Sequence, residues 1–449
     1  MRDFATSDSP AVQAQLDRLA ALSLPQGRFG LETIHALLDR LGNPQRTLPP
    51  FFHFAGTNGK GSTCAFLRAM LEAQGYKVHA ATKPHLVRYN ERIRIAGKLI
   101  EDDHLAALLK EVLDAGEDLA PSFFEVTAAA TFLAFHREPA DVCVIEVGLG
   151  GRFDATNVLD GQAACGIANL GIDHEGFLLV PEEDVPQEPL CRIAFEKAGI
   201  ARPGVPLVTQ AYRPDMTRTI IEQAMLVGAK TAIRDLDWFA SFDRLRMSGG
   251  LDYRDRFGEL DLPLPALAGA HQADNAALAV AMLRHQTQVE VAPDAMAQGI
   301  RNARWSARLQ ELGPGPLTDL MPGKTVLLDG AHNRAAAEAL AEAMKPYAPY
   351  DLIFGLLSNR RIEDVLFPLA PEVRKAYVVP LGGHAHHDPR DVAAYAQSKA
   401  SPRECYPAFN LEQAAEWLFG SGDGPDTVLI AGSLYLAGEV LRLNREWPD

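Results

Sequence analysis

The pattern of apolar and polar positions divides the chain into alternating strand-like and helix-like segments. Short apolar runs of the buried-strand type end at polar or glycine-rich turns, and longer segments of helical period follow them. The apolar runs that begin at Phe51, Lys77, Asp141 and Cys165 predict strands, and residues 11–22, 31–42, 64–75, 101–116, 123–136, 191–200 and 271–286 predict helices. This alternation predicts an open, mostly parallel α/β sheet that collects polar residues at one edge.

Two changes in this pattern predict further structure. Residues 231–264 are short, alternating and rich in turns, which predicts a small antiparallel sheet. The helical pattern breaks near Ala303, and a new alternation follows, with strands predicted at 325–330, 350–357, 376–381 and 427–432 and helices at 335–347 and 411–419. We therefore expect a central domain over 1–303, with a short helical leader, and a smaller Rossmann-like α/β domain over 304–449.

Composition narrows the class of protein. The 449 residues exceed one ordinary core, and 47% of them are apolar, as in a well-buried globular chain. The net charge of −15 argues against a general nucleic-acid binder or a binder of anionic membranes. Five scattered cysteines without a C-x-x-C pair, and an N-terminus without a signal-peptide core, predict a cytoplasmic protein with reduced thiols.

The most informative stretch is FFHFAGTNGKGST, residues 51–63, in which an apolar strand meets a loop with three glycines and one lysine before a helix. Glycines let backbone N–H groups converge on an anion, and the helix N-terminus and Lys60 add positive charge. The strict P-loop spacing is absent, because only two residues separate Gly56 from Gly59 and Gly61 follows Lys60. Tight strand-to-helix packing is the alternative interpretation of this turn.

Other strand ends carry chemistry as well. Glu146 is embedded in an apolar strand, where a carboxylate is costly unless it meets a cation, and Asp173 and His174 follow the next strand. Phosphoryl chemistry needs such oxygen ligands for Mg²⁺, although histidine is an unusual magnesium ligand and His174 could instead be structural. Basic side chains gather after the second strand, at Lys83, His85, Arg88, Arg92, Arg94 and Lys98, as part of an anion site or as a solvated loop.

Seven motifs together resemble the dihydrofolate synthase/folylpolyglutamate synthase family of the Mur ligase superfamily. In chain order they are GTNGKGS at 56–62, HLVRYNERI at 85–93, EVGLGGRFDATN at 146–157, DH at 173–174, FEKAGI at 195–200, DGAHN at 329–333 and SLYLAGEVL at 433–441. The resemblance implies an ATP-dependent amide ligase. ATP would phosphorylate a pterin-linked carboxylate, and the amine of L-glutamate would attack the acyl phosphate. We expect ATP and Mg²⁺ as cofactors and a monomer without nucleic-acid or membrane partners.

The resemblance also implies roles for individual residues. Catalytic roles fall to Lys60, Lys197 and His332, with Lys197 at the position of a lysine that the family carbamoylates. The ATP site would comprise Thr57, Asn58, Gly59, Lys60, Gly61, Ser62, Asn275, Arg308 and Asp329. Metal ligands would be Glu146 and His174. The pterin side would be formed by Phe29, Gly30, Leu31, Ser122, Phe123, Phe124 and Phe153.

Departures from the family pattern are informative. Lys83 stands where the family has a metal-ligand serine, and a protonated lysine has no lone pair for Mg²⁺. We hypothesise that its ammonium occupies or excludes one metal position and supplies the charge. The segment between His174 and Lys197 is longer than usual and acidic, so the match at Lys197 depends on FEKAGI alone.

Two other functions fit parts of the pattern. A Mur-type ligase acting on a UDP-muramoyl peptide would share the chemistry, but it needs an additional N-terminal domain, and the leader of about 50 residues is short for one. A nucleotide-binding protein with a decayed metal site would explain Lys83, although Glu146, His174 and Lys197 are all retained. The motifs do not distinguish dihydropteroate from reduced folates as the substrate, and we expect both.

Overall fold

The computed structural model describes residues 6–22, 30–243, 250–420 and 424–448. The chain divides into two compact units, which we call unit 1, Met1–Ala266 with Gln272–Arg304, and unit 2, Leu267–His271 with Trp305–Asp449. The predicted pterin-side residue Phe29 lies outside the described residues.

Unit 1 is built on an eight-stranded sheet in the order β4-β3-β2-β5-β1-β6-β7-β8. The strands β2, β5, β1, β6, β7 and β8 run parallel to one another, and at one edge β3 pairs antiparallel with both β2 and β4. The bounds are β1 Phe51–Ala55, β2 Val78–Ala81, β3 Ile93–Ile95, β4 Lys98–Leu99, β5 Val142–Glu146, β6 Ala164–Ile167, β7 Pro206–Thr209 and β8 Lys230–Ile233. Every residue of β1, β2, β5 and β6 is buried, as the apolar runs predicted.

A three-stranded antiparallel sheet confirms the second feature of the pattern, with one correction. It comprises β9 Trp238–Asp243, β10 Gly250–Asp255 and β11 Gly258–Pro263. The predicted range began at Thr231, but residues 231–233 belong to β8 of the parallel sheet. Periodicity did not separate them because a short edge strand carries the same alternation as an antiparallel one.

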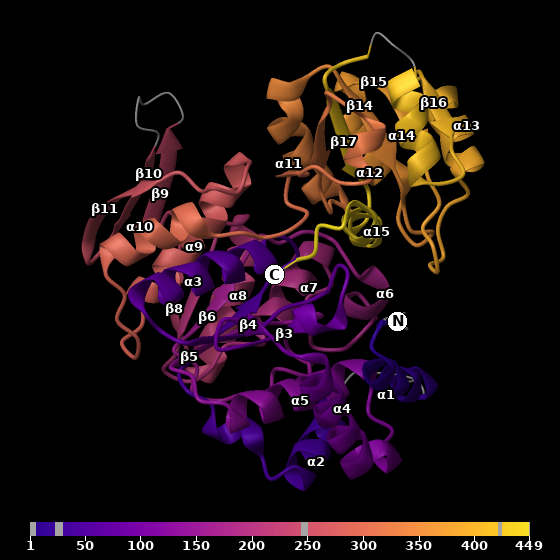
Figure 1. The fold of residues 1–449 in the computed structure, drawn as a ribbon. Coiled ribbons are helices and arrows are strands. Elements are labelled where there is room, and N and C mark those ends of the chain that lie inside the picture. Colours follow the sequence, from indigo (N-terminus) through magenta and orange to yellow (C-terminus); the bar gives the residue numbers. More distant parts are fainter. Residues whose placement is uncertain (1–5, 23–29, 244–249, 421–423, 449) are drawn as a thin grey trace. The chain divides into compact units, whose positions relative to one another are not determined.

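Helices cover the large sheet of unit 1. Helices α1, α2, α4 and α5 form one group (Figure 1), whose core includes Leu16, Leu37, Leu109 and Phe132. Helix α10 packs against α3, while α9 is buried along nearly its whole length. The bounds are α1 Pro10–Ala21, α2 Glu32–Arg40, α3 Lys60–Gln74, α4 Asp102–Gly116, α5 Phe123–Arg137, α6 Glu175–Leu178, α7 Pro189–Ala198, α8 Pro214–Val227, α9 Ala270–Arg284 and α10 Pro293–Asn302.

Unit 2 has a six-stranded sheet in the order β12-β13-β17-β14-β15-β16, in which only β12 runs antiparallel to its neighbour. The strands are β12 Gln310–Glu311, β13 Thr325–Leu328, β14 Tyr350–Phe354, β15 Val373–Val378, β16 Cys405–Pro407 and β17 Thr427–Ala431. The helices are α11 Arg334–Met344, α12 Ile362–Leu369, α13 Pro389–Lys399, α14 Leu411–Gly420 and α15 Leu434–Asn444. The predicted α/β class with a small antiparallel sheet and a second α/β part is confirmed.

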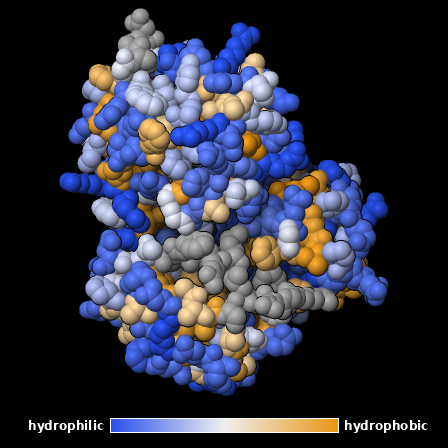
Figure 2. Space-filling model, turned by 90° about the vertical axis from the view of Figure 1, so that its right-hand side faces the viewer, coloured by the Kyte–Doolittle hydropathy of each residue, from blue (hydrophilic) through white to orange (hydrophobic). Residues whose placement is uncertain are grey.

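The surface hydropathy, the lengths of the helices and the cysteines can be compared with the composition. The face seen in Figure 2 is largely hydrophilic, with apolar side chains in separate patches. Within the described ranges, no helix is both long and apolar enough to span a membrane. All five cysteines, Cys64, Cys143, Cys165, Cys191 and Cys405, are buried and unbridged.

Candidate active site

The polar residues predicted at strand ends lie at the carboxyl edge of four adjacent parallel strands. In the order β2-β5-β1-β6, Lys83 follows β2, Glu146 ends β5, Lys60 follows β1, and His174 follows β6. The register pairs Phe54 of β1 with Glu146. Such an edge is where open α/β sheets hold ligands.

The glycine loop between β1 and α3 is held by hydrogen bonds to the segment that follows β6. The N–H of Thr57 donates to the carbonyl of Asn169 at 2.8 Å, and Thr57 Oγ1 donates to the carbonyl of Gly171 at 2.9 Å. Lys60 Nζ donates to the carbonyl of Gly56 at 2.9 Å, so the lysine folds back over the loop. The N-terminus of α3 and the Lys60 ammonium are thus held beside each other, which suits a phosphate chain.

Ser62 provides an independent sign of a ligand. Its side chain is 1% exposed, and Ser62 Oγ has no hydrogen-bond partner among the described residues. A buried hydroxyl normally finds a partner, so an isolated one in a phosphate-type loop fits a missing oxygen ligand or cation.

Gly59 and Asn275 are in close contact in this loop. Gly59 has a φ of +85°, and a Cβ at this position would lie 2.4 Å from Asn275 Oδ1. Asn275, in the buried helix α9, also donates to Gln272 Oε1 at 3.1 Å. The amide therefore sets how closely the loop approaches α9.

We predict that Gly59→Ala weakens ADP binding by about tenfold. The added methyl group must displace the Asn275 side chain, and the alanine must adopt a left-handed φ. Isothermal titration with ADP measures this. Gly75→Ala is the matched control, because Gly75 also has a positive φ, +101°, but open space around it. Equal ADP affinity in the Gly59→Ala and Gly75→Ala variants would contradict the prediction that ADP binds at the glycine loop.

Glu146 is buried beside Lys83. Its Oε2 atom accepts a hydrogen bond from the backbone N–H of Lys83 at 2.9 Å, and only 2% of the residue is exposed. Burial lowers the pKa of Lys83, and the carboxylates of Asp154 and Glu146 oppose that shift. Burial alone would raise the pKa of Asp154, but Lys83 and the hydrogen bond from Thr156 hold it below its usual value.

Asp173 and His174 stand at the end of the segment that follows β6. His174 has a φ of +53°, and Asp173 Oδ1 accepts from the His174 N–H at 2.7 Å. Asp173 is buried, whereas the imidazole of His174 is partly exposed. The turn thus presents the imidazole at the sheet edge with a carboxylate behind it.

Lys197 lies in the last turn of α7 and is 3% exposed. Burial and, to a smaller extent, the charge of Lys60 lower its pKa to about 7, although Asp173 opposes the shift. A pKa near 7 leaves a large share of the amine neutral and nucleophilic at neutral pH. This pKa shift links Lys197 electrostatically to both the phosphate loop and the segment after β6.

A four-charge cluster holds the end of α7 in place. Arg152 Nη2 contacts Glu196 Oε1 at 2.8 Å and Glu182 Oε2 at 2.6 Å, and Arg192 Nη2 contacts the same two carboxylates at 3.0 and 2.7 Å. The two arginines hold the pKa of Glu182 at about 2. Because Glu196 precedes Lys197, this cluster positions the lysine.

The predicted pterin-side residues Phe123 and Phe124 of α5 form an aromatic group with Tyr89, against which Arg92 packs. Tyr89 and Arg92 were not predicted for the pterin side. Ser122 caps α5, and the rings of Phe123 and Phe124 meet edge to face at 5.5 Å. The Arg92 guanidinium lies 5.2 Å from the ring centres of both Tyr89 and Phe123.

The remaining predicted pterin-side residues lie in other loops. Leu31 precedes α2 and packs against the core of the α1–α2–α4–α5 group, and Gly30 lies beside Glu32. Phe153 lies 4.3 Å under the guanidinium of Arg152.

In unit 2, Asp329 organises the turn that carries Arg308. Asp329 Oδ2 accepts from the Leu309 N–H, and Asp329 Oδ1 accepts from the Ala331 N–H, each at 2.8 Å. Burial raises the pKa of Asp329, and the neighbouring Arg308 opposes that shift. His332 Nδ1 contacts the carbonyl of Gly330 at 2.8 Å.

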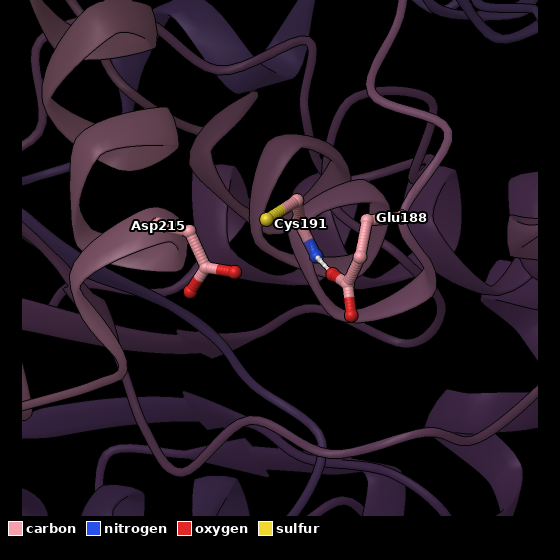
Figure 3. Close-up of side chains that lie close together, drawn as sticks. All are labelled: Glu188, Cys191 and Asp215. Carbon is pink, nitrogen blue, oxygen red and sulfur yellow. Dashed lines mark hydrogen bonds between the residues drawn. The ribbon is translucent and has the colours of Figure 1, made fainter.

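A second cluster of possible metal ligands lies away from the sequence motifs. Figure 3 shows Glu188, Cys191 and Asp215, with the backbone N–H of Cys191 donating to Glu188 at 2.7 Å. The Arg213 guanidinium contacts Glu188 at 3.2 Å and Asp215 at 2.5 Å, and burial raises the pKa of the Cys191 thiol to about 11. We assign this cluster to helix capping and ion pairing.

Known proteins resemble the chain over nearly its whole length. Residues 318–434 match the family model described as Mur ligase, glutamate ligase domain. The dihydrofolate synthase/folylpolyglutamate synthase of Bacillus subtilis is 30% identical over 443 residues, covering 92% of this chain and 94% of that protein.

This chain belongs to the dihydrofolate synthase/folylpolyglutamate synthase family.

Two solved structures of the family agree with the fold. Escherichia coli FolC in complex with DHPP and ADP has a TM-score of 0.83 and 30% identity, with 97% of each chain covered. A bifunctional folylpolyglutamate synthase/dihydrofolate synthase with Mn, AMPPNP and L-glutamate bound has a TM-score of 0.80 and 28% identity, covering 97% of this chain and 98% of that chain.

Two residues of the candidate site, Asp154 and Arg92, were not identified individually from the sequence. Asp154 lies within a quoted motif, but its burial beside Lys83 depends on the folding of the 148–156 loop. Arg92 was predicted only as one of six basic residues, whereas the structure buries it beside His85, with Arg92 Nε 2.9 Å from His85 Nδ1. Arg88 and Lys98 are exposed, so the six do not form one uniform patch.

Proposed function

We propose that this protein adds L-glutamate to a pterin-linked carboxylate, converting dihydropteroate to dihydrofolate and extending reduced folates with further glutamates. It is an ATP-dependent ligase of the folate family, as its full-length similarity to dihydrofolate synthase/folylpolyglutamate synthase indicates. The observation that best supports the chemistry is that Lys60 and Ser62, just after β1, and Glu146, at the end of the adjacent strand β5, share one sheet edge of unit 1, with the charge of Lys60 acting on the buried Lys197 of α7.

The reaction joins two substrates through an acyl phosphate. A carboxylate oxygen attacks the γ-phosphorus of ATP, and the bond to the β-γ bridging oxygen breaks to release ADP. The amine of glutamate then attacks the acyl carbon, loses a proton, and phosphate leaves. The backbone N–H groups of Gly59 and Gly61 and the Lys60 ammonium are proposed to hold the phosphates. Thr57 and Asn58, whose N–H groups donate to the Asn169 carbonyl, are proposed to shape the loop of this ATP site.

A divalent cation fits the remaining donors. Ser62 Oγ is buried without a partner among the described residues, Glu146 is a buried carboxylate, and His174 offers an imidazole at the same edge. We assign these three residues to the metal and propose Mg²⁺ as the ion, because oxygen ligands and phosphates suit it. When bound, the ion neutralises charge on the phosphate oxygens.

Lys197 is proposed to carry a carbamate, because its amine is buried and its pKa is about 7. The modification replaces a cation with a carboxylate-like anion beside Lys60. Asn275, Arg308 and Asp329 remain proposed nucleotide contacts, and His332 a catalytic residue, by their motifs.

The hypothesis that Lys83 takes the place of one metal ion predicts a change in stoichiometry. Lys83→Ser should bind one more Mn²⁺ ion per chain than the unaltered protein in the presence of ADP, measured by electron paramagnetic resonance. Unchanged Mn²⁺ stoichiometry and unchanged turnover in this variant would contradict the hypothesis.

The proposed function is tested by ADP release with MgATP, with dihydropteroate and tetrahydrofolate assayed side by side and L-glutamate present or omitted. We expect release that requires both L-glutamate and a pterin substrate, and glutamylated products by mass spectrometry. If ATP is not turned over with dihydropteroate and L-glutamate or with tetrahydrofolate and L-glutamate, the proposal is overturned and a nucleotide-binding role is favoured.

A further inference from the structure

The Lys83 ammonium is buried at the sheet edge without a hydrogen-bond partner in the described part of the chain. Its backbone N–H donates a hydrogen bond to Glu146 Oε2, which holds the backbone of Lys83 in place. An ammonium has three donors, and burying them without acceptors costs free energy that a ligand oxygen would recover. This isolated donor therefore points to a bound anion.

The Lys83 side chain packs closely against Gly148. A Cβ at Gly148 would lie 3.0 Å from Lys83 Cδ, 3.1 Å from Nζ and 3.3 Å from Asp154 Oδ2. The ammonium and the Asp154 carboxylate thus flank the same glycine, which only a residue without a side chain leaves open.

Asp154 lowers the electrostatic cost of this charge, but its oxygens are already in use. Oδ2 accepts from the N–H groups of Gly148 and Leu149 at 2.9 and 2.8 Å, and Oδ1 accepts from the N–H and hydroxyl of Thr156 at 3.0 and 2.5 Å. The carboxylate therefore supports the charge of Lys83 while leaving the ammonium's donors for another group.

The strand order indicates which anion this is. Strand β5, which ends at Glu146, lies between β2 and β1, so Lys83 stands on the opposite side of Glu146 from the phosphate loop. The aromatic group of Tyr89, Phe123 and Arg92 belongs to the β2 side, because β3 follows Arg92 and pairs with β2. Lys60, by contrast, is folded over the loop itself.

We propose that the Lys83 ammonium binds the carboxylate of the aromatic substrate, the group that ATP phosphorylates. This inference rests on the proposed function and adds a residue that selects an anionic acceptor. Lys83 donates hydrogen bonds to one carboxylate oxygen while the other attacks the γ-phosphorus. No proton leaves the ammonium, and the same contact then stabilises the acyl phosphate.

Binding without turnover tests this assignment. Dihydropteroate and its carboxamide, in which the acid is replaced by a neutral amide, are titrated calorimetrically into the unaltered protein and Lys83→Met with ADP and Mg²⁺ present. We expect the unaltered protein to prefer the acid by about tenfold, the effect of one charge-assisted hydrogen bond, and Lys83→Met to lose that preference. Lys98→Met, an exposed lysine of β4, is the matched control and should retain it.

Each other outcome is decisive. If Lys83→Met keeps the tenfold preference, or weakens the acid and the amide equally, the ammonium does not bind the carboxylate. If the unaltered protein binds neither ligand, the proposed function fails instead, so the two failures are distinguishable. A restored preference in Lys83→Arg would support a role for charge over a role in packing.

Discussion

Replacing Lys197 by methionine is expected to lower kcat by about 100-fold or more, or about 3 kcal/mol of transition-state stabilisation, while ADP affinity changes less than about twofold. Lys197 is 3% exposed and its pKa is about 7, so its amine is largely neutral above pH 7 and can add CO2. Methionine keeps the buried length of the side chain but cannot form a carbamate.

The carbamate itself is measurable by carbon-13 NMR. With labelled bicarbonate, the unaltered protein should show a carbamate resonance that rises as pH increases through about 7, because deprotonation of Lys197 must precede CO2 addition. Lys197→Met should lack it, and Lys230→Met, an exposed lysine of β8, should keep it. A variant at Lys197 with full activity, or no carbamate resonance in the unaltered protein, would contradict this role.

Glu146→Gln is expected to reduce kcat by at least about 100-fold and to weaken Mn²⁺ binding by about tenfold or more, because the buried anion that faces the cation is removed. The amide oxygen can still accept the hydrogen bond that Glu146 Oε2 now takes from the Lys83 N–H. The fold should therefore persist, which thermal unfolding checks.

Glu72→Gln serves as the matched control for Glu146, because Glu72 is exposed on α3 of the same unit. Mn²⁺ titration by electron paramagnetic resonance distinguishes a metal ligand from a packing residue. Unaltered Mn²⁺ affinity in Glu146→Gln, with turnover lost, would remove Glu146 from the metal site.

The elements that position this site could be predicted from the sequence because they are buried on both faces. Strands such as β1 and β5 have unbroken apolar runs, and each ends directly before a motif. Three elements of unit 2 that were not predicted have weaker signals. Strands β12 and β16 have two and three residues, and α12 contains Pro368.

The candidate site was predictable as a set of residues but not as a set of contacts. Motif order identified Lys60, Glu146 and His174, which follow or end adjacent strands of one sheet, and Lys197 in the last turn of α7. No sequence pattern showed that Asp154 supports Lys83. That contact depends on how a glycine-rich loop folds over a strand end.

The acidic segment before Lys197 is a second example. In the sequence it is only a longer and more acidic connection than the family usually has. In the structure its Glu182 binds Arg152 and Arg192, and through Glu196 this cluster fixes the turn that carries Lys197. Such a role follows from long-range ion pairs, which no local spacing reports.

The most direct test of the central claim, amide formation through an acyl phosphate, is the fate of a carboxylate oxygen. Dihydropteroate labelled with oxygen-18 in its carboxylate is incubated with MgATP and L-glutamate, and the released phosphate is analysed by mass spectrometry. The proposed reaction transfers one labelled oxygen to each phosphate formed. Unlabelled phosphate accompanying dihydrofolate would contradict it.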